Sequence, residues 1–295
     1  MALRPGDLAG QVGGRALMAL PAAFVSIFLL IPLALSIVIS FWERAGFKLK
    51  PAFTLASYTD FLGGVRLVVL ERSLVAAGIS TAIGLAIAYP IAYYLARHMR
   101  RDLARSILFL FSVPFLVNYV IRTFAWTYLL GRTGPINEAL QAAGLVGKSV
   151  DWLLFSDFSV QVGFVTSYMP FMVFPLWLSI SGIDRRLTEA SWILGAHPWG
   201  TFLRITLPLS LPGIFAAAIF GFVGAFGDSA VPIILGGVGY QMIGNSITST
   251  LDVLNYPLAA AMSSVVILAM LLLLGFWFLA FDLRSFLGKI VRWRV

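Results

Sequence analysis

Two ionisable residues of opposite charge lie within otherwise apolar segments of the chain. Asp228 belongs to FGDSAVPIILGG (226–237), and Arg122 belongs to NYVIRTFAWTY (118–128). An ionisable group in hydrocarbon is costly unless it faces protein or water, so both side chains are expected to point into a bundle of helices. They can form a salt bridge with each other, or they can line a polar path for a charged solute. The residues alone leave both interpretations open.

Catalytic and nucleotide-binding chemistry would need residue types and spacings that this chain lacks. It has no cysteine and only two histidines, His98 and His197, which excludes thiolate chemistry and argues against a histidine-built metal site. The 13 acidic residues are scattered and form no recognisable catalytic pair. The tripeptide GKS (147–149) resembles the end of a phosphate-binding loop, but Ala142 occupies the place of its first glycine. We therefore expect no catalytic residue, no metal site and no cofactor site in this chain.

The composition indicates a membrane protein. Hydrophobic residues make up 60% of the 295 positions and charged residues only 12%, and the mean hydropathy is +0.92. Soluble domains carry about a quarter charged residues, and runs of about 20 apolar residues suffice to cross the bilayer. We predict an all-α polytopic protein embedded in the lipid bilayer. Its net charge of +8 then reflects topology and does not indicate nucleic-acid binding.

Six apolar segments are predicted to span the membrane within a domain that covers residues 17–283. Their expected ranges are 17–42, 73–96, 107–130, 160–183, 212–235 and 257–281. The remaining parts are a polar N-terminal segment (1–16), a charged loop between the fourth and fifth spans (184–211) and a basic tail (284–295). The first span is longer than a signal-sequence core and has no small-residue cleavage site at its end, so we expect it to be retained.

The distribution of lysine and arginine predicts the orientation. If the N-terminus is cytoplasmic, 13 of the 21 basic residues lie on the cytoplasmic side and 7 lie outside, with Arg122 inside a span. Cytoplasmic loops carry the excess of positive charge in membrane proteins. Both termini and the loop 184–211 are therefore expected to face the cytoplasm.

The fifth predicted span combines small residues with a carboxylate. Ala217, Gly221, Gly224 and Asp228 are spaced so that they share one face of a continuous helix. Small side chains on such a face permit the close approach of another helix. We expect Gly224 and Asp228 to belong either to a translocation path or to the surroundings of a buried ion pair.

The third predicted span contains the other candidate residues of that path. Asn118 and Trp126 flank Arg122 in the same apolar segment. For Trp126, together with Tyr128, an interfacial belt of aromatic residues is the better explanation when these two are taken alone. Most of the predicted spans also contain proline, which indicates bent helices, either from irregular packing or along a translocation path.

The loop 184–211 is predicted to form two short helices joined by a glycine turn. Asp184 can cap the first helix, Gly195 can end it in a left-handed conformation, and Pro198 can begin the second. Glu189 falls opposite an apolar stripe on the first helix, which is expected to pack on the membrane domain. This stripe consists of Ile183, Leu187, Ala190 and Leu194.

The same loop resembles the EAA signature, EAA-x3-G-x9-I-x-LP, of permease subunits of bacterial ATP-binding-cassette importers. The matching residues are Glu189, Ala190, Ser191, Gly195, Ile205, Leu207 and Pro208. Only Ser191 departs from the signature, where it replaces the second alanine. Three further segments, 114–137, 226–237 and 255–263, resemble permeases of the spermidine/putrescine type, and they resemble related systems for opines and other small nitrogenous solutes.

This resemblance implies a fold, partners and a mechanism. The fold would be the six-helix, MetI-like architecture of type I importer permeases in a bacterial inner membrane. The partners would be a second, similar but distinct permease, two cytoplasmic ATPase subunits that bind ATP and magnesium, and an extracytoplasmic substrate-binding protein. In this family the loop inserts into a groove of the ATPase, where Glu189 would pair with basic groups and Gly195 would allow the turn.

The expected function is ATP-driven import of a small nitrogenous solute by alternating access. A self-sufficient secondary transporter or channel is the alternative, although the signature loop has no use there. The loop helix could also be an amphipathic helix at the membrane surface. Asp228 would suit a cationic polyamine, whereas Asp228 and Arg122 together would suit a zwitterion such as an opine or an amino-acid derivative.

Overall fold

The structure is a computed structural model that describes residues 21, 23–46 and 48–280. The chain forms two compact units. One contains residues up to Gly64 together with Ser249–Leu273, and the other contains Val65–Thr248 together with the residues from Leu274 onward. The predicted N-terminal segment (1–16), the basic tail (284–295) and parts of the first and last predicted spans (17–20, 22 and 281) lie outside the described residues.

The first unit holds the first and most of the last predicted span. The helix Ala23–Ser40 contains a π-helical segment, η1 (Ser26–Leu30), and α2 (Ile31–Ser40), and it is apolar enough to cross a membrane. An antiparallel hairpin of β1 (Glu43–Ala45) and β2 (Lys48–Lys50) follows, then α3 (Ala56–Leu62). The sixth predicted span is the helix α14 (Tyr256–Ala280), whose last residues belong to the second unit.

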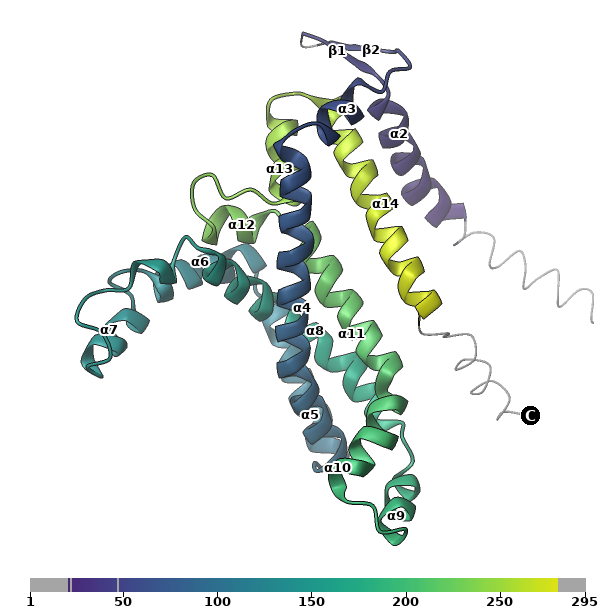
Figure 1. Ribbon diagram of the computed structural model, residues 1–295, viewed down its shortest axis with the longest axis vertical. Coiled ribbons are helices and arrows are strands. Elements are labelled where there is room, and N and C mark those ends of the chain that lie inside the picture. Colours follow the sequence, from purple (N-terminus) through teal and green to yellow (C-terminus); the bar gives the residue numbers. More distant parts are fainter. Residues whose placement is uncertain (1–20, 22, 47, 281–295) are drawn as a thin grey trace, which may run out of the picture. The chain divides into compact units, whose positions relative to one another are not determined.

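The second unit is built on three long helices that pack side by side (Figure 1): α4 (Val65–Arg97), α8 (Asp157–Ser181) and α11 (Leu207–Gly227). Small residues let these helices approach closely, because a Cβ at Gly84 or Gly221 would collide with, or press tightly against, the side chain of Met172. Ala88, Ala92 and Ala217 are fully buried in the same core. The larger side chains of α8 thus pack against small residues on α4 and α11.

The third predicted span is helical at both ends but is not continuous. It consists of α5 (Arg101–Ser112), a 3₁₀ turn η2 (Val113–Leu116) and α6 (Tyr119–Leu130). Pro114 cannot donate a backbone hydrogen bond, and the side chain of Asn118 accepts the backbone N–H of Val120 and so begins a new helix. Five helices of the described residues are therefore long and apolar enough to span a membrane.

The fifth predicted span begins and ends earlier than expected. One continuous helix of 30 residues runs from Pro198 to Gly227 and comprises α10 (Pro198–Thr201), a π-helical segment η4 (Phe202–Thr206) and α11. The second helix of the predicted loop is therefore the extension of a membrane-spanning helix. Asp228 is extended and separates α11 from α12 (Ala230–Leu235), so it does not continue the face of Gly221 and Gly224 as predicted.

The remaining helices connect these elements. They are α7 (Pro135–Ala142), the 3₁₀ turn η3 (Asp151–Leu153), α9 (Arg185–Ile193) and α13 (Ile243–Asp252). The helices α9 and α10 lie at one end of the bundle of α4, α8 and α11, and α6 and α12 lie toward the other end (Figure 1). The two ends of this bundle are thus built from different segments, and each contains predicted functional residues.

A charged cluster ties α4 to α8 at the end opposite α9. Arg72 forms a 2.8 Å ion pair with Asp157, and the Tyr240 hydroxyl donates to the same carboxylate at 2.6 Å. The Arg72 guanidinium also stacks 4.1 Å from the centre of the Tyr240 ring. Burial, followed by the hydrogen bond to Asp157, raises the pKa of Tyr240, so the hydroxyl stays protonated at neutral pH and keeps its donor role.

Candidate functional site

The predicted glycine turn of the loop 184–211 is present, with its caps. The Asp184 carboxylate accepts the backbone N–H of Arg186 at 2.9 Å and begins α9. Gly195 has a φ of +80°, and its N–H donates to the carbonyl of Trp192 at 2.9 Å. Pro198 starts the next helix. The predicted roles of these residues as N-cap, left-handed stop and helix start are confirmed.

Ser191, the residue that departs from the EAA signature, joins the two helices of the loop. Its hydroxyl lies 2.8 Å from the Thr201 hydroxyl and also donates to the carbonyl of Thr188 at 2.8 Å. Both Ser191 and Thr201 are buried. This bond therefore fixes the angle between α9 and the long helix that begins at Pro198.

The apolar stripe predicted on α9 is not packed on the membrane domain. Leu187 is 46% exposed and Leu194 is 87% exposed, although Ile183 is buried. The tip of the loop instead exposes Trp192 and Trp199. The prediction was wrong because the small Ser191 forms the contact between the helices, and this leaves the large apolar side chains on the outside. Exposed apolar residues of this kind mark an interaction surface.

We expect Ser191→Ala to loosen the loop, although it restores the alanine of the signature. The substitution leaves the buried Thr201 hydroxyl without this partner, at a cost of about 1–3 kcal/mol. Hydrogen exchange of residues 185–206 should become faster in the full-length protein. The double variant Ser191→Ala/Thr201→Val removes both hydroxyls and should recover most of the protection. Equal protection in the single variant would contradict this role of the hydrogen bond.

The end of the signature lies where the π-helical segment passes into α11. Ile205 and Thr206 belong to η4. Leu207 begins α11, and its backbone N–H donates a hydrogen bond to the carbonyl of Phe202. Pro208 has no N–H to donate to the preceding turn, and wider π turns accommodate such a missing bond. The signature proline therefore sits inside one continuous helix and does not end it.

At the other end of that helix, Asp228 is nearly buried and accepts several hydrogen bonds. It is 5% exposed. Its Oδ1 accepts the backbone N–H groups of Ala230 at 2.8 Å and Val231 at 3.2 Å, and also the Tyr119 hydroxyl at 3.4 Å. Its Oδ2 accepts the Tyr168 hydroxyl at 2.8 Å. The carboxylate thus begins α12 and connects that helix to α6 and α8.

Gly224 brings Tyr168 to this carboxylate. A Cβ at position 224 would collide with the Tyr168 ring, so only glycine lets the ring lie against the backbone of α11. Gly221, one turn earlier, contacts Met172 of the same neighbouring helix. The predicted close approach of another helix to this face is confirmed, and the partner is α8.

Arg122 and Asp228 do not form an ion pair. The Arg122 Nη1 donates to the carbonyl of Pro114 at 3.1 Å, and its Nε is buried without a hydrogen-bond partner among the described residues. Arg122 therefore stabilises the break between α5 and α6. Asn118 caps α6 at this break, and Trp126 is partly buried two turns after Asn118.

The two tyrosines that donate to Asp228 were not predicted from the sequence. Tyr119 begins α6 and Tyr168 lies in the middle of α8, so each is far from Asp228 along the chain. A hydroxyl within an apolar helix is the available signal, because a buried Tyr usually finds a hydrogen-bond partner. The spacing of residues cannot identify that partner when it lies on another helix.

The chain is similar to known transport proteins. Residues 80–285 match the family described as binding-protein-dependent transport system inner membrane component. The spermidine/putrescine transport system permease protein PotB of Escherichia coli (strain K12) is 37% identical over 255 residues, which cover 85% of this chain and 92% of that protein. PotB of Haemophilus influenzae is 32% identical over 256 residues, covering 86% and 88%.

The fold is also similar to solved structures. A chain of a bacterial ABC transporter involved in the import of the acidic polysaccharide alginate superposes with a TM-score of 0.74 at 17% sequence identity. The superposition covers 92% of this chain and 95% of that chain. At this identity the similarity bears on the fold alone.

Proposed function

This chain belongs to the family of binding-protein-dependent transport system inner membrane components, and it is the permease subunit of an ABC importer. On this basis we propose that it imports polyamines of the spermidine/putrescine type. It is a multi-pass protein of the inner membrane. The similarity to PotB over 85% of the chain supports this class of substrate. An opine or an amino-acid derivative is the second candidate, because such solutes carry amino groups as well.

The proposed assembly contains two different permeases, two ATPase subunits and an extracytoplasmic binding protein. ATP and magnesium are bound by the ATPase subunits. Both termini and the loop 184–211 face the cytoplasm, where α9 docks on an ATPase through its exposed tip and Glu189. The exposure of Trp192, Leu194 and Trp199 supports this docking, since a lone permease chain leaves them without cover.

The continuous helix from Pro198 to Gly227 carries the proposed mechanism. Its 30 residues measure about 45 Å, enough to cross the hydrocarbon layer and reach beyond it. One end begins in the docking loop, and the other ends at Asp228. Because one helix joins these two places, a tilt of the loop on ATP binding changes the position of Asp228.

Asp228 and its two tyrosines are the proposed contacts of the solute. A buried carboxylate stabilises an ammonium group, and the faces of Tyr119 and Tyr168 can add cation–π attraction. The hydroxyls of both tyrosines already donate hydrogen bonds to the carboxylate, so an ammonium group can replace one of them as a donor to Asp228. Arg122 is held at the Pro114 carbonyl, away from a direct pair with Asp228.

Uptake by the reconstituted complex tests this proposal. Proteoliposomes with both permeases and the ATPase inside should accumulate labelled spermidine only when ATP and the binding protein are supplied. Accumulation of an opine in place of spermidine would reject the substrate while keeping the mechanism. Transport by this chain alone, driven by an ion gradient, would favour a secondary transporter and would reject the mechanism.

A further inference from the structure

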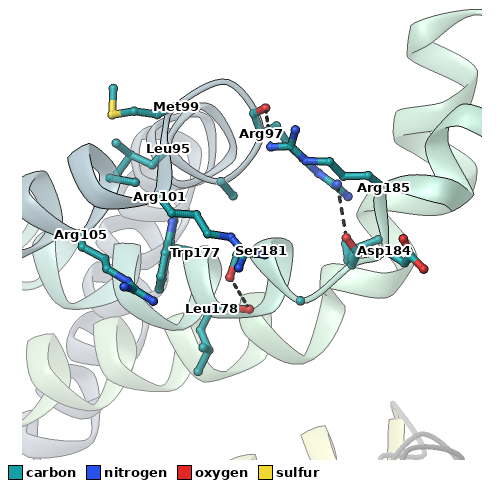
Figure 2. A pocket seen from close by; sticks show the side chains of 14 residues that line it. Leu95, Arg97, Met99, Arg101, Arg105, Trp177, Leu178, Ser181, Asp184 and Arg185 are labelled. Carbon is teal, nitrogen blue, oxygen red and sulfur yellow. Dashed lines mark hydrogen bonds between the residues drawn. The ribbon is translucent and has the colours of Figure 1, made fainter.

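A pocket of about 770 Å³ lies at the end of the bundle that carries α9 (Figure 2). Its walls come from the last turn of α4, the first turns of α5, the last turns of α8 and the segment that leads from α8 into α9. Both α4 and α8 are long and apolar enough to span a membrane, and the pocket lies where they end. The pocket is therefore at the level expected for lipid head groups.

The charge of this pocket is strongly positive. Four arginines line it, and the only carboxylate in the lining is that of Asp184, which already accepts the Arg186 N–H as the cap of α9. The four arginines are Arg97, Arg101, Arg105 and Arg185. Arg101 and Arg105 are four residues apart on α5, so their like charges share one face and repel each other. A bound anion would relieve this repulsion.

Several donors in the pocket have no acceptor within the described chain. The Nε and Nη2 atoms of Arg97 and the Nε1 atom of Trp177 are buried and lack a hydrogen-bond partner among the described residues. The Nη1 of Arg97 makes only a long bond, 3.4 Å, to the carbonyl of Ile183. Unpaired buried donors cost about 1–3 kcal/mol each, and more when charged. An oxyanion with several acceptor oxygens would satisfy them together.

The apolar part of the pocket distinguishes a lipid from a soluble anion. Met99 and Leu178 line the pocket beside the arginines, and Leu178 is 68% exposed on a membrane-spanning helix. Leu103 and Phe109 are likewise exposed on α5. An acyl chain can cover such side chains, whereas inorganic phosphate cannot. Basic pockets between helices on the cytoplasmic side are known to suit anionic head groups.

We propose that this pocket binds the phosphodiester head group of an anionic phospholipid. Arg97 and Trp177 would donate from its interior, while Arg101 and Arg105 would close on the phosphate from α5. Arg185 is the first residue of α9, and its Nη2 donates to the carbonyl of Arg97 at 3.4 Å. A bound lipid would therefore contact the start of the docking loop. This inference does not depend on which solute is carried.

Lipid binding to the purified full-length chain in neutral detergent tests the proposal. We expect native mass spectrometry to show retained phosphatidylglycerol in preference to phosphatidylcholine. The variant Arg101→Gln/Arg105→Gln changes exposed residues and should fold normally. It should weaken phosphatidylglycerol binding about 25-fold, from roughly a fivefold loss for each guanidinium. The matched variant Arg186→Gln/Arg204→Gln removes two exposed charges outside the pocket lining, and it should retain the lipid.

Four results would overturn the proposal. Equal retention of the two lipids would show that the pocket has no preference for an anionic head group. Equal weakening by both double variants would show general charge attraction only. Displacement of phosphatidylglycerol by millimolar inorganic phosphate would assign the pocket to a soluble anion. Loss of the lipid when the ATPase subunits are added would show that the partner displaces the lipid from the pocket in the complex.

Discussion

Reversing the charge of Glu189 is expected to abolish ATP-driven uptake, while the chain still inserts into the membrane. Glu189 is exposed on α9, and its carboxylate forms no hydrogen bond or ion pair with the described part of the chain. Its substitution therefore leaves the fold intact and acts on the partner. Breaking a buried charge pair at an interface costs about 2–5 kcal/mol, which corresponds to a roughly 30-fold or greater loss of affinity for the ATPase.

The measurement is spermidine uptake by proteoliposomes, together with copurification of the ATPase. Glu138→Arg is a matched control, because Glu138 is also exposed on a helix, α7, but lies outside the loop. The control should transport normally, and the ATPase should copurify with it. If Glu189→Arg transported at the normal rate, the loop could not be the coupling element.

Gly195 provides a second test of the same loop. Proline at this position would force φ to about −65°, and it would remove the N–H that bonds to Trp192. We expect Gly195→Pro to abolish coupling as well. Gly195→Ala should have a smaller effect, a cost of about 1–2 kcal/mol from the left-handed backbone alone, because the space around Gly195 is open. Gly200→Ala, also in open space but with ordinary helical φ, should be harmless.

The local features of the loop could be predicted because each depends on a few neighbouring residues. Asp184 and Arg186, or Gly195 and Trp192, meet within a single helical turn, and their types alone specify a cap or a stop. The membrane-spanning helices could be predicted for a similar reason, since a long apolar run has few alternatives in a bilayer. The spacing of the EAA signature then identified the loop 184–211 as the docking loop of a permease.

The contacts between helices could not be predicted in the same way. Tyr168 is 60 residues from Asp228, and Tyr240 is 83 residues from Asp157, so no local pattern relates them. The break between α5 and α6 also depends on the tertiary structure. Pro114 alone would allow a kinked helix, but the Pro114 carbonyl is taken by Arg122 and the chain restarts at Asn118. A continuous span was the simpler expectation from hydropathy.

Neutralising Asp228 without changing its shape is expected to reduce uptake at least about tenfold, equivalent to roughly 1.4 kcal/mol. In Asp228→Asn, the Oδ1 can still accept the N–H groups of Ala230 and Val231, so the start of α12 is kept. The amide can also bond to the Tyr168 hydroxyl, which then accepts. The fold should therefore survive with a small change in Tm, while the attraction for an ammonium group is lost.

Asp228→Ala separates the structural role from the role in transport. It leaves two backbone N–H groups and two tyrosine hydroxyls without this acceptor, at about 1–3 kcal/mol for each buried group. Its Tm should fall far more than that of Asp228→Asn. Asp252→Asn, which neutralises an exposed carboxylate on α13, controls for the loss of one negative charge. Normal uptake by Asp228→Asn would show that Asp228 is only the cap of α12.

Gly224→Ala tests how the carboxylate is positioned. The added Cβ would push the Tyr168 ring away from the backbone of α11. This would lengthen the 2.8 Å hydrogen bond from the Tyr168 hydroxyl to Asp228. Overpacking of this kind costs about 1–3 kcal/mol, and we expect uptake to fall with it. Gly227→Ala adds the same methyl group to the same helix in open space, so it should transport normally. Because Gly224 contacts Tyr168 and not Asp228, a loss of uptake confined to Gly224→Ala would show that Tyr168 keeps the carboxylate in its working position.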